Sequence, residues 1–294
     1  MKLLDRLNEV AEGAKAIDTV CFHHNDSDGH AAAAVVVRKY GKNIGLVEMD
    51  YDKAEDYDFS DVPKDATVII VDFSFKPEKM AELQKITQNI TWIDHHKTMF
   101  DAPYNTKDMP GIRSDEGSGC YLAWIHFFPD LDIPKAIALV SDYDTWTNKI
   151  PDSMAFAEAC RTIESPKSEL WEKMLDNDES SVLGMIEKGK IILEYREAFC
   201  VGYSKDYGFE CTFEGKKCFA LNIYAWGSEA FGQRMNDYDI CISFVFNGSQ
   251  YQIGLYSAKD IDVGEIAKKH GGGGHKGAAG FIVDDLPFKP EKKE

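Results

Sequence analysis

The sequence predicts an α/β protein in which a doubly wound, mainly parallel sheet is followed by a helical connector and a smaller α+β domain. Three observations lead to this prediction. Apolar, β-branched runs alternate with helical patterns in the first half of the chain, only helical patterns occur in residues 152–205, and short strand patterns return after residue 208. We therefore expect a first domain over residues 1–185, a helical linker over 186–207 and a second domain over 208–294.

Composition limits what the chain can bind. Its 294 residues are 44% hydrophobic and 28% charged, as in ordinary soluble proteins, and no run approaches the roughly 18 apolar residues of a membrane span, so we expect no membrane partner. Seven cysteines without a CxxC pair favour the reducing cytoplasm. The net charge of -17 argues against a grip on duplex nucleic acid, which needs a basic stripe.

The first predicted strand, residues 18–24, leads into the acidic loop NDSDGH and an alanine-rich helix. In an extended segment the side chains of His24, Asp26 and Asp28 share one face, so that an imidazole and two carboxylates converge on one point. The alternative interpretation is a turn of Asn, Asp and Ser without a ligand.

Further strands are predicted at 44–50 and 66–75. The second is a nearly continuous β-branched run, typical of a strand buried on both faces of a parallel sheet, and Asp72 lies near its end. Open α/β sheets bind their ligands at the carboxyl ends of such strands, so Asp72 is a candidate ligand. A helix that begins at Pro77 is expected to cross over to a strand at 90–93.

The strand 90–93 runs directly into Asp94, His95 and His96, which places three potential metal ligands at one strand end. A polar turn that happens to hold two histidines is the alternative interpretation.

Core helices are predicted at 117–129 and 134–141, and the second leads into Asp142 and Asp144. We expect Asp142 to be a ligand, because it follows a small residue at the expected end of the helix. Asp144 is then expected to support the ligands or to cap the helix.

Carboxylates gathered from four such motifs would repel one another and titrate abnormally unless cations neutralise them. Two divalent ions about 3.5 to 4 Å apart that share an aspartate would do so, and such pairs promote in-line displacement at phosphorus. Oxygen ligands with one or two imidazoles, and no cysteine in the motifs, suit Mn²⁺.

The second domain is predicted to contain two helices and strands in four segments, 209–214, 216–224, 239–246 and 251–257. Aromatic residues in it are candidates for stacking on nucleobases, although core packing is the favoured role for most of them: Tyr224, Trp226, Phe231 and Tyr256.

The last feature of this domain is a glycine run within KKHGGGGHKGAAGF (268–281). Gly272, Gly273 and Gly274 allow backbone amides to approach an anion closely, while His275 and Lys276 contribute donors. A flexible linker is the alternative, but a linker would not combine these glycines with a histidine and a lysine.

Five motifs in this order resemble those of the DHH phosphoesterase superfamily with its DHH-associated C-terminal domain. They are HNDSDG (24–29), VDFSF (71–75), DHHKT (94–98), SDYDTW (141–146) and GGGGHKGAAGF (271–281). The motifs span nearly the whole chain, and together they are far more specific than any one alone. The chain looks most similar to the small bacterial oligoribonucleases of the superfamily, the nanoRNases.

The resemblance implies a two-domain enzyme that holds two Mn²⁺ ions per chain, or Mg²⁺ or another divalent ion, and that receives its substrate across a cleft. It implies the following roles: His24 and Asp26 bind one metal; Asp28, His95 and Asp142 bind the other; Asp72 bridges them; Asp94 and His96 are catalytic, with His96 facing the scissile phosphate; and His275 with the glycine loop holds a phosphate or the terminal nucleotide.

Two departures from the family pattern leave positions open. Some relatives have their first histidine where this chain has Phe22, so either His23 or His24 can be that ligand.

The second departure lies in the C-terminal domain. Many relatives have an arginine in a Ser-x-Arg-Ser segment, where this chain has Tyr256. The phosphate contact then falls to Lys276, Arg161 or Arg234, and Tyr256 is a candidate for stacking on a base.

The function that the resemblance implies is hydrolysis of short RNA oligonucleotides to mononucleotides by two-metal activation of water. The alternatives are hydrolysis of linear or cyclic dinucleotides, or of 3′-phosphoadenosine 5′-phosphate, and, outside the enzymes, a nucleotide-binding regulator. The expected partner is therefore a short single-stranded RNA or a dinucleotide, and a homodimer is possible. The acidic charge agrees with a short substrate, which needs no long basic track.

Overall fold

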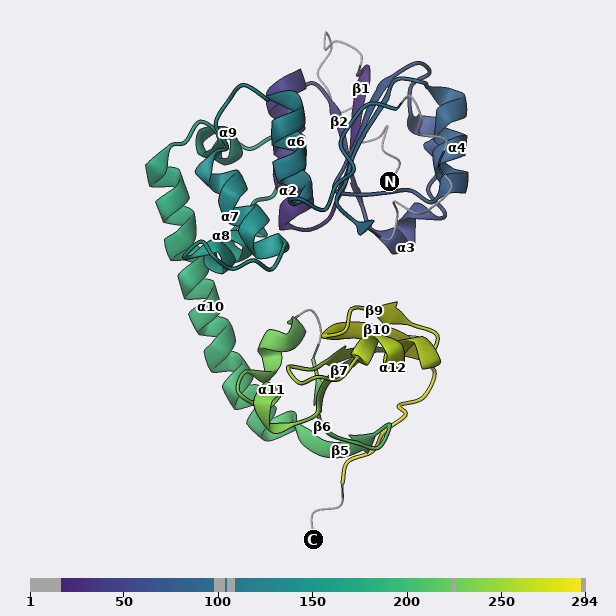
Figure 1. Cartoon of the computed structure of the whole chain (residues 1–294), viewed down its shortest axis with the longest axis vertical. Coiled ribbons are helices and arrows are strands. Elements are labelled where there is room, and N and C mark those ends of the chain that lie inside the picture. The colour runs from purple at the N-terminus through teal and green to yellow at the C-terminus, as the bar shows by residue number, and fades with distance from the viewer. Residues whose placement is uncertain (1–16, 98–103, 105–108, 224–225, 292–294) are drawn as a thin grey trace. The chain divides into compact units, whose positions relative to one another are not determined.

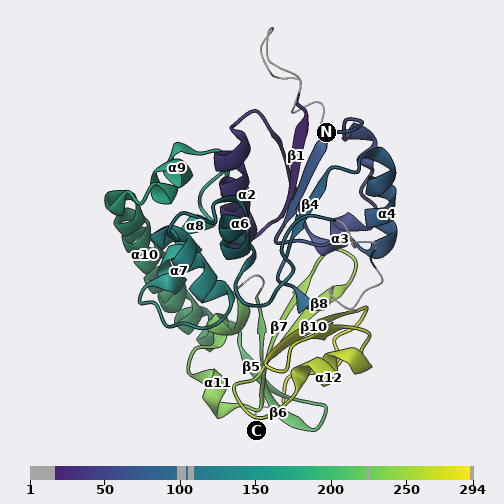
Figure 2. The same ribbon diagram turned by 45° about the horizontal axis from the view of Figure 1, so that its top comes forward.

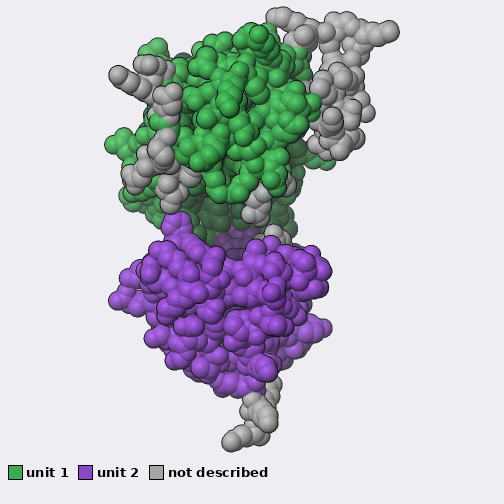
Figure 3. Space-filling view, turned by 90° about the vertical axis from the view of Figure 1, so that its right-hand side faces the viewer, with its two compact units in different colours: residues 1–192 green, residues 193–294 purple. Residues whose placement is uncertain are grey.

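The chain divides into two compact units, Met1–Ile192 and Leu193–Glu294 (Figure 3). The computed structural model describes residues 17–97, 104, 109–223 and 226–291. The boundary between the units lies inside helix α10 (Glu179–Tyr207), which also contains the linker predicted at 186–207.

Unit 1 is built on a four-stranded sheet in the order β2-β1-β3-β4. Its strands are β1 (Thr19–His24), β2 (Gly45–Met49), β3 (Thr67–Val71) and β4 (Ile90–Ile93), and all three pairings are parallel. From β1 the chain moves outward to β2, and from β3 it moves outward in the opposite direction to β4. The order of the strands therefore reverses between β1 and β3, the place where open sheets of this kind bind ligands.

Helices cover both faces of this sheet (Figure 1, Figure 2). Helices α2 (Ser27–Tyr40) and α6 (Gly119–Phe127) lie on one face, while α4 (Pro77–Ile86) and the short α3 (Tyr51–Ala54) lie on the other. Alternate residues of each strand enter two separate apolar cores: Cys21 and Ile69 face the α2 side, and Phe22 and Ile70 the α4 side. Burial on both faces explains the nearly continuous apolar run of β3.

Four further helices directly follow α6 in the described part of the chain. They are α7 (Lys135–Asp144), α8 (Ser153–Cys160), α9 (Glu169–Leu175) and α10, and a 3-10 turn, η1 (Phe59–Asp61), precedes β3. None of the helices in the described ranges is long and apolar enough to cross a membrane.

The loop after β1 differs from the sequence prediction. Strand β1 ends at His24, and α2 already begins at Ser27, so His24, Asp26 and Asp28 do not share a face of one extended segment. The Asp26 carboxylate caps the helix by accepting a hydrogen bond of 2.8 Å from the Gly29 N–H. Asp28 lies in the first turn of α2 and is fully buried.

Unit 2 contains a six-stranded mixed sheet in the order β5-β6-β7-β8-β10-β9, in which only the β6–β7 pairing is parallel. Helix α12 packs on the apolar face of this sheet, so the unit is an α+β domain as predicted. Its elements are β5 (Phe209–Phe213), β6 (Lys216–Asn222), η2 (Gly227–Phe231), α11 (Arg234–Asp237), β7 (Ile240–Phe246), β8 (Tyr251–Tyr256), α12 (Val263–Lys269), β9 (Gly273–Gly274) and β10 (Ala278–Val283).

Candidate metal centre

The predicted ligands of unit 1 meet at the carboxyl ends of β1, β3 and β4. His24 is the last residue of β1, Asp72 directly follows β3, and Asp94 directly follows β4. Because these strands are parallel neighbours, their carboxyl ends lie at one edge of the sheet.

Asp72 occupies the middle of this group and is 1% exposed. Its backbone has a φ of 52°, a left-handed conformation that few residues other than glycine adopt. Helix α6 begins directly against it, since a Cβ added to Gly119 would lie 2.4 Å from the Cβ of Asp72. Both carboxylate oxygens of Asp72 are buried and accept no hydrogen bond from the described residues. Burial, together with the charges of Asp28 and Asp26, holds the pKa of Asp72 well above its usual range.

On one side of Asp72 lie His24 and Asp26. The His24 Nδ1 is 3.8 Å from Asp72 Oδ2 and 2.9 Å from Asp26 Oδ2. Burial raises the pKa of Asp26, but the hydrogen bonds from His24 and from the Gly29 N–H outweigh it, so this carboxylate stays ionised. An imidazole and two carboxylates are thus within reach of one cation.

On the other side of Asp72 lies His95. Its Nε2 is 3.2 Å from Asp72 Oδ1, 3.4 Å from Asp144 Oδ2 and 3.9 Å from Asp28 Oδ2. The Asp28 carboxylate is fixed by the start of α6, where it accepts hydrogen bonds from the N–H groups of Gly119 at 2.6 Å and Cys120 at 3.0 Å. A second set of one imidazole and three carboxylates therefore converges here.

The structure places Asp144, and not the predicted ligand Asp142, beside His95. The Asp142 carboxylate accepts hydrogen bonds from the Thr147 hydroxyl at 2.8 Å and from the N–H groups of Lys149 at 2.9 Å and Ile150 at 3.0 Å. It therefore ties down the loop after α7. Asp144 Oδ2, in contrast, is buried beside His95 and accepts no hydrogen bond from the described residues.

Helix α7 does not end where its sequence pattern suggests. The helix runs to Asp144, so both acids belong to its last turn and their side chains point to different sides. Burial and the charges of Asp28 and Asp26 raise the pKa of Asp144 to about 9.

Asp94 and His96 form a separate pair at the edge of the group. Asp94 is fully buried and accepts hydrogen bonds from the Ser74 hydroxyl, from the His95 N–H at 2.8 Å and from the His96 Nδ1 at 2.8 Å. These donors occupy the Asp94 carboxylate, and the bond to Nδ1 holds the His96 ring in its orientation. With Nδ1 bound to Asp94, the Nε2 of His96 remains for a ligand.

The structure also decides between the two neighbouring histidines of the first motif. His23 is 2% exposed, its Nδ1 lies 2.8 Å from the His24 carbonyl oxygen, and its ring packs against His30. It is therefore a core residue, and burial lowers its pKa to about 4. His24 is the histidine that meets Asp26 and Asp72.

The donor set fits divalent cations. Among the described residues, three groups have ligand atoms that all lie within 4.8 Å of one another: His24, Asp26 and Asp72; Asp28, His95 and Asp144; and Asp72, His95 and His96. Three buried carboxylate oxygens in these groups, both of Asp72 and one of Asp144, lack the hydrogen bonds that buried acids normally have. Carboxylate oxygens with imidazole nitrogens are ligands that Mn²⁺ accepts well.

Tyr51 is a neighbour of this centre that sequence reasoning missed. Its ring centroid lies 5.7 Å from that of His24 and 5.9 Å from that of His96, and it packs on Phe73. Helix α3, which begins with Tyr51, is tied to the first motif by a hydrogen bond of 3.2 Å from Asn25 to Asp50. No local pattern in its acidic loop distinguishes Tyr51 from the nearby tyrosine at position 57.

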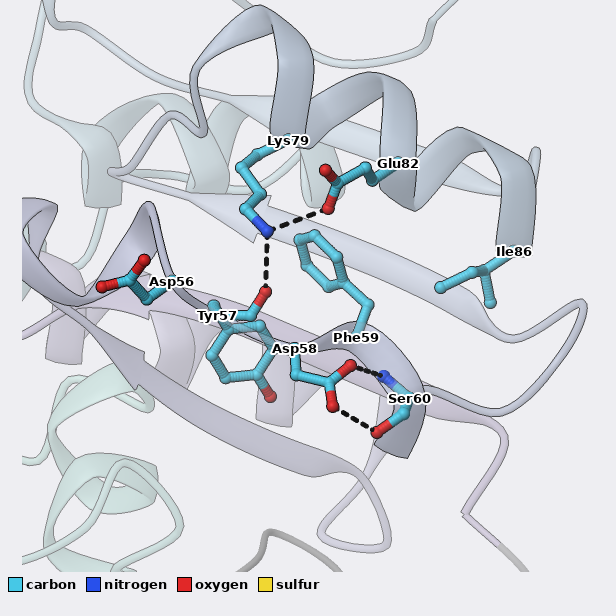
Figure 4. A pocket seen from close by; sticks show the side chains of 8 residues that line it. All are labelled: Asp56, Tyr57, Asp58, Phe59, Ser60, Lys79, Glu82 and Ile86. Carbon is cyan, nitrogen blue, oxygen red and sulfur yellow. Dashed lines mark hydrogen bonds and ion pairs between the residues drawn. The ribbon is translucent and has the colours of Figure 1, made fainter.

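The hollow drawn in Figure 4 is not part of the centre. It has a volume of about 420 Å³, lies beside α4 and shares no lining residue with the ligand groups. Lys79 spans it, bonded to the Tyr57 carbonyl at 3.2 Å and to Glu82 at 2.9 Å, so the one lysine that lines it is already engaged (Figure 4).

Comparison with known proteins identifies the C-terminal part first. Residues 228–294 match the DHHA1 domain family. The chain is 28% identical over 301 residues to an uncharacterized protein of Acanthamoeba polyphaga mimivirus. The alignment covers 93% of this chain and 70% of the viral protein.

Solved structures extend the likeness to the fold of nearly the whole chain. The pGpG-specific phosphodiesterase PggH of Vibrio cholerae is 15% identical to this chain, and its structure matches with a TM-score of 0.53. The match covers 90% of this chain and 93% of the PggH chain. The DHH domain of a member of a ribosomal protein family is 14% identical with a TM-score of 0.58, over 96% of this chain and 88% of its own.

The chain shares its fold with these two solved structures, and residues 228–294 match the DHHA1 domain. At these identities the two solved structures establish the fold alone.

The glycine run of the DHHA1 domain is explained largely by packing. Strand β9 (Gly273–Gly274) pairs with β10, and a Cβ on Gly272 would lie 2.0 Å from the Gly280 carbonyl oxygen. Gly274 has a φ of 139°. Gly272 and Gly274 therefore allow two strands of the domain to approach closely, whereas a Cβ on Gly273 would meet none of the described atoms within 4 Å. His275 and Lys276 follow them at the surface.

The other predicted substrate contacts are spread over both units. Lys276 of the DHHA1 domain forms an exposed ion pair with Asp260. Tyr256 packs against Phe231 with centroids 5.9 Å apart, and the Arg234 guanidinium lies 4.8 Å from the Phe219 ring centroid.

Arg161 belongs to unit 1 and is the predicted cation that acts on the metal centre itself. Its charge lowers the pKa values of Asp26 and Asp144 in opposition to burial. Its side chain is 51% exposed and its Nε lies 3.6 Å from Glu158.

Of the aromatic residues considered for base stacking, Phe231 is buried, Trp226 packs on Phe199, and Tyr224 lies outside the described residues.

Proposed function

We propose that this protein is a divalent-metal-dependent phosphodiesterase that hydrolyses short RNA oligonucleotides to mononucleotides. The observation that carries the proposal is the Asp72 carboxylate. Its two buried oxygens lack hydrogen-bond donors among the described residues and face one ligand group on each side. A bridging carboxylate between two cations would satisfy both oxygens.

The side chains divide the work as follows. His24, Asp26 and Asp72 would hold one Mn²⁺ ion, and Asp28, His95, Asp144 and Asp72 the other. When bound, such a pair of ions polarises a phosphoryl oxygen and activates water for in-line attack.

His96 would contact the scissile phosphate. Burial lowers its pKa, but the hydrogen bond with the Asp94 carboxylate outweighs burial, so the pKa of His96 is raised and its ring stays protonated to higher pH. A protonated imidazole whose Nδ1 is held by Asp94 donates from Nε2 to a phosphate oxygen. Arg161, the exposed cation whose charge reaches Asp26 and Asp144, would receive a neighbouring phosphate.

The charge of the molecule supports a short substrate. A chain with a net charge of -17 repels a long polyanion, while a few phosphates can be held by the metals and single cations. His275 and Lys276 of the DHHA1 domain are the proposed contacts for a terminal phosphate, with Tyr256 for a base.

A linear dinucleotide is the second candidate substrate. The solved structure of PggH, a pGpG-specific phosphodiesterase, shares the fold over 90% of this chain with a TM-score of 0.53. A dinucleotide is also the shortest oligonucleotide, so the two candidates differ in whether longer RNAs are hydrolysed.

The test is hydrolysis of a 5′-labelled RNA series from dinucleotides to about twenty nucleotides. Mn²⁺ is present throughout, and pGpG, cyclic dinucleotides and 3′-phosphoadenosine 5′-phosphate are assayed alongside. We expect the shortest RNAs to be converted fastest to mononucleotides, and Asp72→Asn to abolish turnover while the exposed Asp132→Asn retains it. Turnover of dinucleotides alone would select the second candidate. Absence of turnover of every compound by the metal-loaded wild type would refute both.

A further inference from the structure

Helix α10 carries a continuous row of aromatic side chains within unit 2. Tyr195, Phe199, Tyr203 and Tyr207 follow one another at intervals of four residues, so they lie on one face of the helix. Neighbouring rings contact each other, with centroids 6.4 Å apart for the first pair, 5.3 Å for the second and 4.7 Å for the third. Tyr195 and Tyr207 remain 66% and 62% exposed. We call these four residues the aromatic ridge.

A row of small residues lies beside the aromatic ridge. Ala198 and Gly202 each precede a ridge residue by one position and are both exposed, so they form a row of small residues along the same helix, which we call the groove. A Cβ at Gly202 would meet none of the described atoms within 4 Å, so packing within one chain does not require a glycine there. Glycine in a helix interior is unfavourable relative to alanine. Gly202 thus leaves open space on the surface of the helix that a partner can fill.

The ridge and the groove are complementary to each other. Rows of residues four apart on one helix pack between the corresponding rows of another helix. Because α10 carries a ridge and a groove side by side, a two-fold axis would place the ridge of each copy in the groove of the other.

The charge of this face also fits a second copy of the chain. Residues 190–207 contain three basic and three acidic residues, so the helix is locally neutral in a chain whose net charge is -17. Two copies can approach here without the repulsion that their acidic surfaces would otherwise cause.

We propose that this face of α10 is the contact between two copies of the chain in a homodimer, with the aromatic ridge of each packed against Ala198 and Gly202 of the other. Single-stranded RNA fits the face less well. Each ring already contacts a neighbouring ring, and the helix has no excess of basic residues.

Sedimentation equilibrium of the full chain over a range of concentrations tests the proposal. We expect a monomer–dimer equilibrium in the wild type, and an increase of at least about tenfold in the dissociation constant for Tyr195→Glu and for Gly202→Leu. Gly184→Leu is the matched control. Gly184 lies in the same helix, is exposed and has equally open space at its Cβ position, but it is far from the ridge, so its dissociation constant should not change.

Disulfide cross-linking gives a second readout that does not depend on weakened association. All seven cysteines of the chain are buried, so Ala198→Cys introduces a thiol that is exposed at the groove. We expect a covalent dimer with diamide for Ala198→Cys and none for Gly184→Cys.

Three results would overturn the proposal. One is a wild type that stays monomeric at every concentration. Another is a dimer whose dissociation constant is the same in both ridge-and-groove variants. The last is a monomer that binds single-stranded RNA in the wild type and loses that binding in Tyr195→Glu, which would assign the face to nucleic acid.

Discussion

At the scale of single residues, the carboxylates of the candidate metal centre are of two kinds. Some accept hydrogen bonds from neighbouring groups, and others accept none from the described residues. Asp142 and Asp94 accept several hydrogen bonds each, and these bonds determine loop and ring positions. Asp72 and Asp144 are buried with oxygens that accept none from the described residues. Burying a charged oxygen without a partner is costly, so these two residues are the strongest candidates for cation ligands.

The neighbouring acids of α7 allow a direct comparison. We expect Asp144→Asn to weaken Mn²⁺ binding at least about a hundredfold, because it removes a ligand oxygen, with no loss of loop structure. Asp142→Asn should leave Mn²⁺ affinity unchanged and lower the free energy of unfolding by about 1 to 3 kcal/mol, because loop donors lose a charged acceptor. Calorimetric titration and denaturant unfolding measure the two effects. Equal loss of metal affinity in both variants would return Asp142 to the ligand set.

The pH dependence of the metal-free protein follows from Asp144. Burial and the charges of Asp28 and Asp26 raise its pKa to about 9 in the folded chain, from an ordinary value of 3.8. Between these values the folded state holds a proton that the unfolded state has released, so the free energy of unfolding falls as pH rises. We expect Asp144→Asn, measured with a chelator present, to reduce this fall. An identical pH profile in the wild type and the variant would contradict the assignment.

At the scale of secondary structure, the elements of unit 1 were predictable from sequence where apolar periodicity decides, as in β4, whose predicted limits at 90–93 are the observed ones. The ends of other elements were not. The predicted strand 66–75 ends at Val71 because the backbone of the next residue, Asp72, adopts a left-handed conformation. No pattern in the sequence predicts that conformation for an aspartate. Helix α7 extends to Asp144 because capping is a matter of tertiary hydrogen bonds as well as local sequence.

The same limit applies to the candidate site: the sequence predicts some of its residues but not others. The residue types and the strands that carry them follow from the motifs, so His24, Asp72 and His95 were placed correctly at one edge. Choosing between Asp142 and Asp144, or finding Tyr51, requires side-chain directions that depend on contacts between distant segments. Likewise, the glycine run predicts an anion site, but strand packing requires Gly272 and Gly274 in any case.

A substitution at the start of helix α6 tests whether this helix positions Asp72 in the candidate metal centre. A Cβ at Gly119 would lie 2.4 Å from the Cβ and 2.8 Å from the Cα of Asp72, so Gly119→Ala must move one of two buried segments. We expect a loss of about 1 to 3 kcal/mol in unfolding free energy and a clear loss of Mn²⁺ affinity. Gly45→Ala in β2 is the control, since its new Cβ would have no neighbour closer than 3.6 Å. Unaltered metal affinity in Gly119→Ala would show that α6 does not position Asp72.

At the scale of the whole molecule, the chain consists of two units with separate apolar cores. Two clusters lie in unit 1, and two others lie in unit 2, where the last turns of α10 take part. Every residue of the three candidate ligand groups belongs to unit 1. Metal binding should therefore stabilise one unit without acting directly on the other.

Hydrogen exchange with and without Mn²⁺ tests this division. At a free concentration about 100 times its dissociation constant, a ligand of the folded state adds about 2.7 kcal/mol of stability. We expect this added stability to slow exchange of the amides of unit 1, most of all in β1, in β3 and at the start of α6. The amides of the β5–β10 sheet should exchange at the same rate with and without Mn²⁺. Asp72→Asn should abolish the protection, and Asp132→Asn should retain it, because only the former removes the carboxylate shared by two ligand groups. Equal protection of both units would mean that they unfold as one, and protection that survives in Asp72→Asn would remove this residue from the bridging position.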